Sequence, residues 1–168
     1  KIHPDQYSVY NNFLGENDAL RSLYMLPGIM NVTDAANGLL VRGGEQDGNL
    51  FLLDGNPVFN PTHMLGALSI VNKTSMRSMQ LFKSDFPSRY GGRLSSVIDV
   101  YTKDGNMEQW GGEANLNLLA GSFTLEGPLK KNKTAVMISF RHSMFNSLLN
   151  AFQKDFHNNF YDIQFKCT

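Results

Sequence analysis

The sequence contains a single cysteine, Cys167, and this excludes two classes of protein. One thiol cannot build a disulfide framework within the chain, and it cannot supply a thiolate-rich metal site. An excess of charge of one sign is also absent, because 15 basic residues balance 15 acidic ones. The charge therefore gives no reason to expect a nucleic acid or an anionic membrane surface as partner. Disorder is disfavoured as well, since charged residues make up only 18% of the chain and apolar residues 42%.

Long apolar runs are missing too. No stretch approaches the ~20 consecutive apolar residues that a membrane-spanning helix needs. A spanning β-strand needs only about 9–11 residues of alternating character, so the membrane is not excluded on this ground.

The chain also lacks the motifs that mark common enzymes. Its four histidines are scattered and do not have the spacing of a metal-binding helix. There is no Gly-x-Ser-x-Gly elbow and no P-loop. The triplets Asp-Gly-Asn that begin at Asp47, Asp54 and Asp104 lack the spacing of an EF-hand, and turns explain them better. We therefore expect no enzymatic activity, no cofactor and no metal ion.

The first part of the chain, residues 1–107, has the pattern of a small mixed α/β unit. Asn17 or Asp18 can cap a short helix, and Pro27-Gly28 can end it. A second short helix is predicted over His63–Val71. Four apolar runs are short, bounded by turn residues and rich in branched or aromatic side chains, which predicts strands. These runs are Leu39–Val41, Leu50–Leu53, Met79–Phe82 and Val97–Tyr101.

From residue 108 onward the pattern changes to a period of two. In three segments apolar residues alternate with polar ones, so that each predicted strand has one apolar face and one polar face. The segments are 114–118, 136–141 and 161–166. The turn Lys130–Lys133 is short, whereas Ser143–Asn159 is longer and rich in polar and aromatic residues. Short turns at one end and long loops at the other are typical of transmembrane β-barrels.

Alternation alone favours a soluble β-sandwich, because that architecture is commoner. Two observations favour a barrel. The polar faces mix charged residues with Asn and Gln, as a wet lumen would, and three or four strands are too few to enclose a core. The fold class that we expect is α+β: a mixed sheet with short helices over residues 1–107, followed over residues 108–168 by the first three or four antiparallel strands of an incomplete transmembrane β-barrel.

Several motifs, in order along the chain, resemble TonB-dependent outer-membrane receptors, and most closely those of Bacteroidetes-type bacteria. In the first part these are Leu26–Ile29, Val41–Gly44, Leu52–Asn60, Phe86–Val100 and Lys103–Asn106. In the second part they are Leu125–Leu129 and Ser139–Arg141. In that family a plug domain blocks a barrel of about 22 strands. The resemblance implies that residues 1–107 are a plug and the rest the beginning of the barrel. The energy-coupling segment and first plug strand of the family are not visible before Asn17, so we expect an incomplete plug.

The resemblance also implies two groups of site residues. In relatives the apex of the plug contacts the substrate, and the matching positions carry groups suited to a polar ligand. These positions are Arg42, Asn56, Phe59, Asn60 and His63. In relatives, plug cations face carboxylates of the barrel wall, and the matching positions are Lys83, Arg89 and Arg93. For every one of these residues a purely structural role is at least as compatible with the sequence.

We therefore expect part of an active transporter in the outer membrane of a Gram-negative bacterium, importing a large nutrient such as a glycan, a peptide or a siderophore. Its expected partners are membrane lipid, a TonB-type energy-coupling protein, the extracellular nutrient and a substrate-binding lipoprotein. The alternative is a soluble α/β protein-interaction module with an appended β-sheet. By itself the chain is expected to self-associate, because the barrel strands would expose unpaired edges and an apolar face.

Overall fold

The computed structural model of the chain describes residues 18–33, 36–63, 68–83, 86–144, 146 and 159–168. Among these, one compact unit is formed by residues of Asp18–Val71 and Met76–Thr102, and a second by Asn72–Ser75 and residues of Lys103–Thr168. The second unit thus begins a few residues before the predicted boundary at 107, and it also takes in a short segment from the middle of the first part. The identification of the two units with a plug and a barrel domain stays a prediction.

The first unit is built around a four-stranded mixed sheet. The sheet has the order β4-β3-β8-β7, in which β3 and β8 run parallel and the outer pairs are antiparallel. Its strands are β3 (Asn49–Leu53), β4 (Asn56–Pro57), β7 (Met76–Phe82) and β8 (Ser96–Thr102). Two smaller antiparallel pairs accompany it: β1 (Ile29–Thr33) with β2 (Ala36–Val41), and β5 (Thr62–His63) with β6 (Leu68–Ser69). All four strands expected from the apolar runs are confirmed as β2, β3, β7 and β8, whereas the sequence analysis did not predict β1, β4, β5 and β6.

In the part of the chain that the structure describes, the helices are shorter than the sequence predicts. The segment after Asp18 forms η2 (Arg21–Met25), a single 3₁₀ helix, and a second short one, η3, covers Gln46–Gly48. The Asp18 carboxylate accepts a hydrogen bond from the Leu20 amide at 2.8 Å in the turn before η2, but the N-cap position of η2 is Leu20 and not Asp18. The predicted helix over His63–Val71 is wrong, because the described residues at its two ends belong to the paired strands β5 and β6. The structure is mostly β, so the expected α content was too high.

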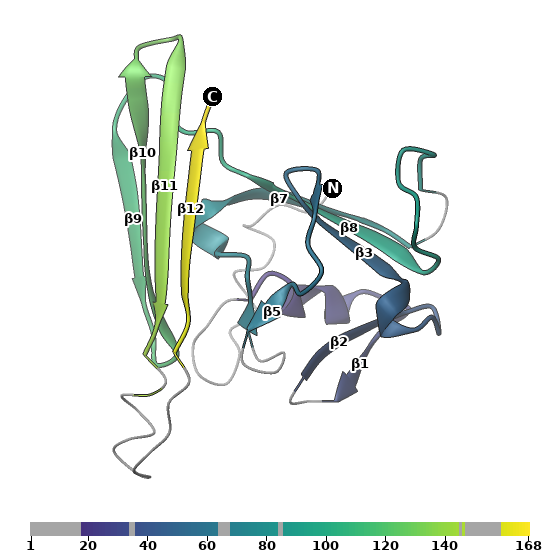
Figure 1. The fold of residues 1–168 in the computed structure, drawn as a ribbon. Coiled ribbons are helices and arrows are strands. Elements are labelled where there is room, and N and C mark those ends of the chain that lie inside the picture. Colours follow the sequence, from purple (N-terminus) through teal and green to yellow (C-terminus); the bar gives the residue numbers. More distant parts are fainter. Residues whose placement is uncertain (1–17, 34–35, 64–67, 84–85, 145, 147–158) are drawn as a thin grey trace. The chain divides into compact units, whose positions relative to one another are not determined.

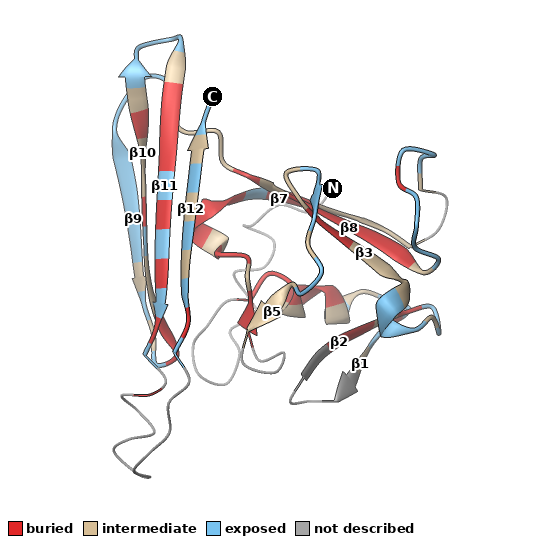
Figure 2. Cartoon of the chain, viewed as in Figure 1, coloured by how far each residue is buried: buried red, intermediate tan, exposed pale blue. Residues whose placement is uncertain are grey.

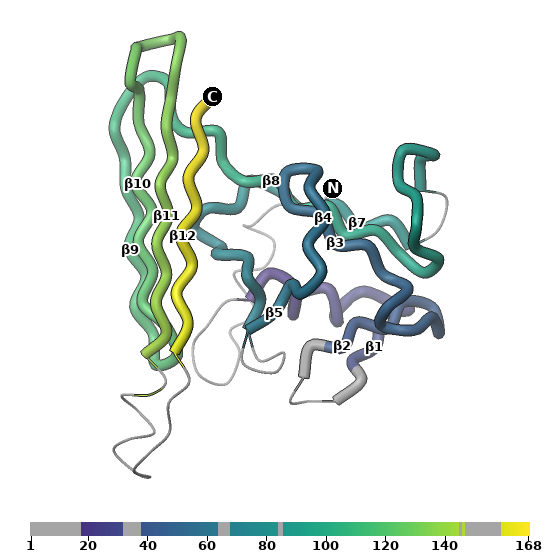
Figure 3. The backbone as a smooth tube through the Cα atoms, in the orientation of Figure 1, coloured from purple at the N-terminus to yellow at the C-terminus, as the bar shows by residue number. Residues whose placement is uncertain are grey.

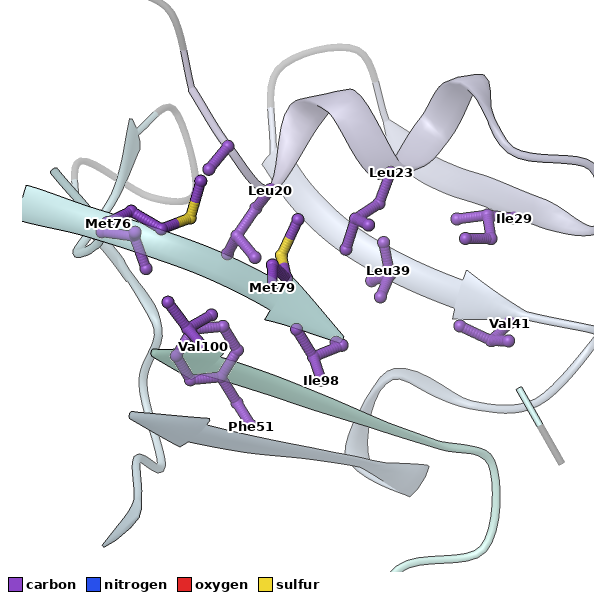
Figure 4. Packing of buried hydrophobic residues seen from close by; sticks show 12 residues of the cluster. Leu20, Leu23, Ile29, Leu39, Val41, Phe51, Met76, Met79, Ile98 and Val100 are labelled. Carbon is purple, nitrogen blue, oxygen red and sulfur yellow. The ribbon is translucent and has the colours of Figure 1, made fainter. Parts of the chain in front are cut away.

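The core of the first unit lies between one face of the four-stranded sheet and the segment that contains η2, β1 and β2. Figure 4 shows Leu20 and Leu23 directed toward Met79, Ile98 and other residues of the sheet. Leu23 and Met79 have no exposed surface, and burial of such a side chain contributes about 1.5–3 kcal/mol to folding. The apolar spacing that suggested a helix therefore marks the core face of a shorter turn.

The second unit is a sheet of four antiparallel strands in the order β12-β11-β10-β9. Figures 1 and 3 show these strands running side by side over most of their length. They are β9 (Gly111–Leu116), β10 (Ala120–Lys130), β11 (Thr134–Ser143) and β12 (Tyr161–Cys167). A short 3₁₀ helix, η5 (Lys73–Ser75), belongs to the same unit. The tight turn at Lys130–Lys133 is confirmed, with Asn132 at a φ of 56°, whereas most of the predicted loop 143–159 lies outside the described residues.

Candidate functional site

Most large apolar side chains of the β9–β12 sheet share one face, and that face is exposed; Met137, on the opposite face, is buried. The antiparallel register places Leu125 beside Ile138 and Ile138 beside Phe165 in one row across the strands. The next row contains Phe123, Phe140 and Ile163. The exposed fractions are 48% for Phe123, 44% for Ile138, 43% for Phe140, 66% for Ile163 and 67% for Phe165. We call this surface the outward face.

The opposite face of the same sheet, the inward face, carries polar side chains, and in its middle they are buried. Thr124, Ser139 and Arg141 are each only 2% exposed. Figure 2 shows the resulting alternation of buried and exposed residues along β11. A soluble β-sandwich buries its apolar face and leaves its polar face in water. The observed arrangement is the reverse, which is how a strand between lipid and a filled lumen is built.

Amphipathic aromatic side chains lie near the two ends of the outward face. Trp110 packs on Gly127 of β10, so closely that a Cβ atom built on this glycine would lie 2.2 Å from the indole Cδ2 atom. At the other end, Tyr161 is paired with His142, and the Tyr161 side chain is 70% exposed. Aromatic girdles at both interfaces characterise transmembrane barrels. The 11 residues of β10 also match the ~9–11 residues that a spanning strand needs.

A cross-strand ion pair lies on the inward face. Arg141 and Asp162 are register partners on β11 and β12, and the Arg141 Nε and Nη2 atoms donate to Asp162 Oδ2 at 2.9 and 2.6 Å. The guanidinium group also lies over the Phe160 ring, 5.4 Å from its centroid. Because the Arg141 side chain is almost fully buried, this pairing neutralises a charge that would otherwise be costly to bury.

A short piece of chain lies on the buried part of the inward face. We call Asn72–Ser75 the docking segment; it stands between β6 and β7 in the sequence. Asn72 Nδ2 donates to Ser139 Oγ at 2.9 Å, and the hydroxyl groups of Thr74 and Thr124 are 2.6 Å apart. Ser75 donates to Gln164 Oε1 at 2.5 Å. Thr124 also donates to Ser139 at 2.9 Å, so the partners form one connected network.

The five residues predicted to contact a ligand lie in the first unit, three in turns or loops and two, Asn56 and His63, in the short strands β4 and β5. Arg42 is exposed, with a φ of 52°, in the turn that follows β2. Asn56 follows the tight turn at Asp54-Gly55, which is held by a hydrogen bond of 3.0 Å from the Thr102 amide to Asp54. The Phe59 side chain is 89% exposed.

The other two residues of this group have local partners. Asn60 Oδ1 accepts hydrogen bonds from the amide and hydroxyl groups of Thr62 at 3.4 and 3.3 Å. His63 lies in β5 and is half-buried. The structure does not test whether any of the five residues binds a ligand.

Two of the three predicted plug cations are engaged within the first unit. Lys83 Nζ donates to the Pro27 carbonyl oxygen. Arg89 Nη2 donates to the Tyr90 hydroxyl at 2.7 Å, and its guanidinium lies 4.6 Å from the centroid of that ring. Arg93 is exposed. Pairing of these cations with carboxylates of a barrel wall stays a prediction.

Behind Arg89 lies a buried carboxylate that sequence reasoning missed. Asp99, on β8, is 1% exposed, and its Oδ2 atom accepts hydrogen bonds from Tyr90 at 2.9 Å and from Tyr101 at 2.5 Å. The hydrogen bond to Asp99 is the main cause that raises the pKa of Tyr101 above its usual range. The network fixes the loop that carries Arg89 to the sheet. In the sequence, the buried carboxylate could have been recognised because Asp99 is a charged residue inside the apolar run Val97–Tyr101.

Phe59 and Arg93 come together at a cavity of about 140 Å³ in the first unit. Apolar side chains such as Leu20 and Ile98 line it, together with polar groups that include Asp47 and Gln46. The volume of this cavity and the residues that line it suit a ligand group that consists of one small ring with polar substituents. Over the described part of the chain, no group of three or more His, Cys, Asp or Glu side chains is arranged to hold a metal ion, and no helix is long and apolar enough to cross a membrane.

Comparison with solved structures finds siderophore receptors. The receptor PirA from Acinetobacter baumannii matches with a TM-score of 0.63 and 18% identity, over 84% of this chain and 24% of that protein. The ferric enterobactin receptor PfeA from Pseudomonas aeruginosa, an R480A/Q482A mutant, matches with a TM-score of 0.62 and 17% identity, over 84% of this chain and 24% of that protein. The chain has the fold of a segment of a siderophore receptor.

This segment spans about a quarter of the length of those receptors. A further match is PfeA (Q482A) in complex with enterobactin, with a TM-score of 0.57 and 18% identity over 75% of this chain and 22% of that protein. These proteins are receptors and not enzymes, in keeping with the missing catalytic motifs. No protein-family model matches the sequence, and no curated protein matches it.

Proposed function

We propose that this chain is the plug and the first barrel strands of an outer-membrane active transporter. The observation that carries the proposal is the reversed burial of the β9–β12 sheet, with Phe140 and Ile163 exposed while Ser139 and Arg141 are buried. Lipid is the solvent in which such an outward face is stable. The shared fold with siderophore receptors supports the same assignment.

In this proposal the first unit is the plug, and the complete transporter imports a large nutrient with energy from a TonB-type periplasmic partner. The ligand class extends to glycans and peptides as well as siderophores. The exposed loop that carries Phe59, together with Arg42, is the ligand-contacting part of the plug. A substrate-binding lipoprotein is a further proposed partner, and the source is proposed to be a Bacteroidetes-type bacterium.

The alternative, a soluble protein-interaction module, requires the outward face of β9–β12 to be covered by protein. The polar network that fills the inward face disfavours it, because a soluble module would bury the apolar face in preference to Thr124 and Ser139.

Fractionation of cells that produce the full-length gene product tests the proposal. We expect the protein in the outer-membrane fraction, with electrophoretic mobility that changes on heating, as folded barrels show. Recovery of a folded protein from the soluble fraction without detergent would contradict the proposal.

A further inference from the structure

The docking segment Asn72–Ser75 is joined at both ends to the core of the first unit. Its neighbours in the chain, Val71 and Met76, are 2% and 1% exposed and belong to the apolar cluster of that unit. The segment itself groups with the β9–β12 sheet. The chain therefore passes from the first unit at Val71 into the docking segment, which belongs to the second unit, and re-enters the first unit at Met76.

The segment has a rigid internal structure. The Ser75 amide donates to the Asn72 carbonyl oxygen at 3.1 Å. The Ser75 hydroxyl oxygen, whose proton is directed to Gln164, lies 2.9 Å from the same carbonyl oxygen. The Thr74 amide donates to Asn72 Oδ1 at 3.2 Å. These bonds hold the short 3₁₀ turn in one shape, so its side chains meet the sheet with little further loss of conformational freedom.

The contacts between the docking segment and the sheet are neutral and buried. Asn72, Thr74 and Ser75 are between 1% and 5% exposed, and their partners Thr124 and Ser139 are 2% exposed. If the segment left the sheet without rearrangement, several buried hydroxyl and amide groups would lose their partners, which is costly. Salt screens such neutral contacts much less than it screens ion pairs. The Lys103 amide adds a backbone bond to the Ser75 carbonyl oxygen at 2.8 Å.

We infer that the docking segment is a fixed anchor: it stays on the inward face of the β9–β12 sheet when the first unit loosens. The inference rests on the proposed function, in which the plug must rearrange to open a path. It divides the plug into a retained part, Asn72–Ser75, and a part that can move, to which the β3–β8 pair belongs.

Hydrogen exchange read by mass spectrometry, on the full-length receptor in detergent micelles at increasing urea, tests the anchor. We expect the amides of Thr74 and Ser75 to become exchangeable at the urea concentration that opens β10 and β11, above the concentration that opens β3 and β8. Exchange of these amides together with β3 and β8 would overturn the inference.

A double variant, Thr124→Val with Ser139→Ala, removes hydroxyl partners of the docking segment. We expect exchange of the segment to become about tenfold faster, as the loss of buried hydrogen bonds would produce, with no change in β10 and β11. Ser122→Ala is the matched control, because Ser122 is a half-buried serine on β10 whose side chain makes no hydrogen bond within the described part of the chain. Thr124→Ser keeps the hydroxyl group and should show the same exchange as the parent. Unchanged exchange of the docking segment in the double variant would contradict the anchor.

A disulfide gives a second readout. Thr74→Cys with Thr124→Cys, in a Cys167→Ser background, replaces two hydroxyls that are 2.6 Å apart, so we expect complete cross-linking in isolated outer membranes under mild oxidation. No cross-link in a receptor that is folded in the outer membrane would overturn the anchor and leave the proposed function intact. Absence of the receptor from the outer membrane would instead contradict the proposed function.

Discussion

Gly127 shows how one missing side chain shapes the outward face. The indole ring of Trp110 occupies the space where a Cβ atom would stand. We expect Gly127→Ala to lower the free energy of unfolding by about 1–3 kcal/mol, as overpacking does. Because Trp110 is the only tryptophan of this sequence, its fluorescence emission, followed in the full-length receptor with any tryptophans elsewhere replaced, reports the displacement of the ring directly.

Gly111→Ala is the matched control, since nothing lies within 4 Å of a Cβ atom at this position. Combining Gly127→Ala with Trp110→Ala should remove the clash. An unchanged emission spectrum in Gly127→Ala would show that the ring does not lie on this glycine.

The ion pair between Arg141 and Asp162 gives a prediction about a buried charge. Asp162→Ala removes the carboxylate that accepts two hydrogen bonds from the Arg141 guanidinium, a group that is 2% exposed. We expect a loss of about 3–5 kcal/mol in the free energy of unfolding, measured by urea titration of the receptor in micelles. Replacing both residues, as in Arg141→Met with Asp162→Leu, should be far less harmful. A loss under 1 kcal/mol in Asp162→Ala would mean that the pair is solvated.

Tyr101 gives a prediction about pH. Its hydrogen bond to Asp99 raises the pKa of the phenol, so the folded state keeps the proton at a pH where the unfolded chain has lost it. The stabilisation is therefore complete below the ordinary pKa of ~10 and is lost as the pH rises toward the raised pKa. Asp99→Asn should lower the pKa of Tyr101, measured as tyrosinate absorbance against pH. Identical titration curves for variant and parent would contradict the assigned cause.

At the scale of the strand, we expect the effect of a substitution in β11 to depend on the face of the sheet on which it lies and on how close it is to the bilayer midplane. Phe140→Arg places a charge on the outward face, which costs about 2–4 kcal/mol near the bilayer midplane. His142→Arg lies closer to the end of the strand, where the cost falls to about 0–1 kcal/mol. We expect the first variant, and not the second, to lower the yield of folded receptor in phospholipid vesicles, measured by heat-modifiable electrophoresis. Equal yields would contradict a lipid-facing β11.

The strands could be predicted from the sequence because their signal is local. The run Val97–Tyr101 and the alternation over 136–141 each determine which side chains share a face, and the structure has both as strands, β8 and β11. The helix predicted over His63–Val71 failed because its apolar spacing also suits two short strands in a pair.

Other features of the structure could not be predicted, because they depend on contacts that the sequence pattern does not reveal. Nothing local to Asn72–Ser75 indicates that it lies on strands some 50 to 90 residues further along the chain. The Asp99 network joins residues that are closer in the sequence; the charged residue inside the run Val97–Tyr101 marks the carboxylate, but nothing in the sequence identifies Tyr90 as its partner. For the predicted ligand-contacting residues, the structure supplies positions in loops and short strands and a cavity that Phe59 helps to line.

At the scale of the whole molecule, every part of the account depends on which face of the β9–β12 sheet meets lipid. The outward face carries large apolar side chains and aromatic ends, and the inward face carries a buried polar network. A sheet of this kind is stable only where oil lies on one side and packed polar groups lie on the other.

Spin labels introduced one at a time at positions 137 to 142 of the full-length receptor, in lipid vesicles, test this claim most directly. Collision rates with oxygen, which concentrates in lipid, and with a water-soluble nickel chelate are measured at each position. We predict high oxygen accessibility at 138, 140 and 142, and low accessibility to both probes at 139 and 141. High nickel accessibility at 138 and 140 would contradict the account.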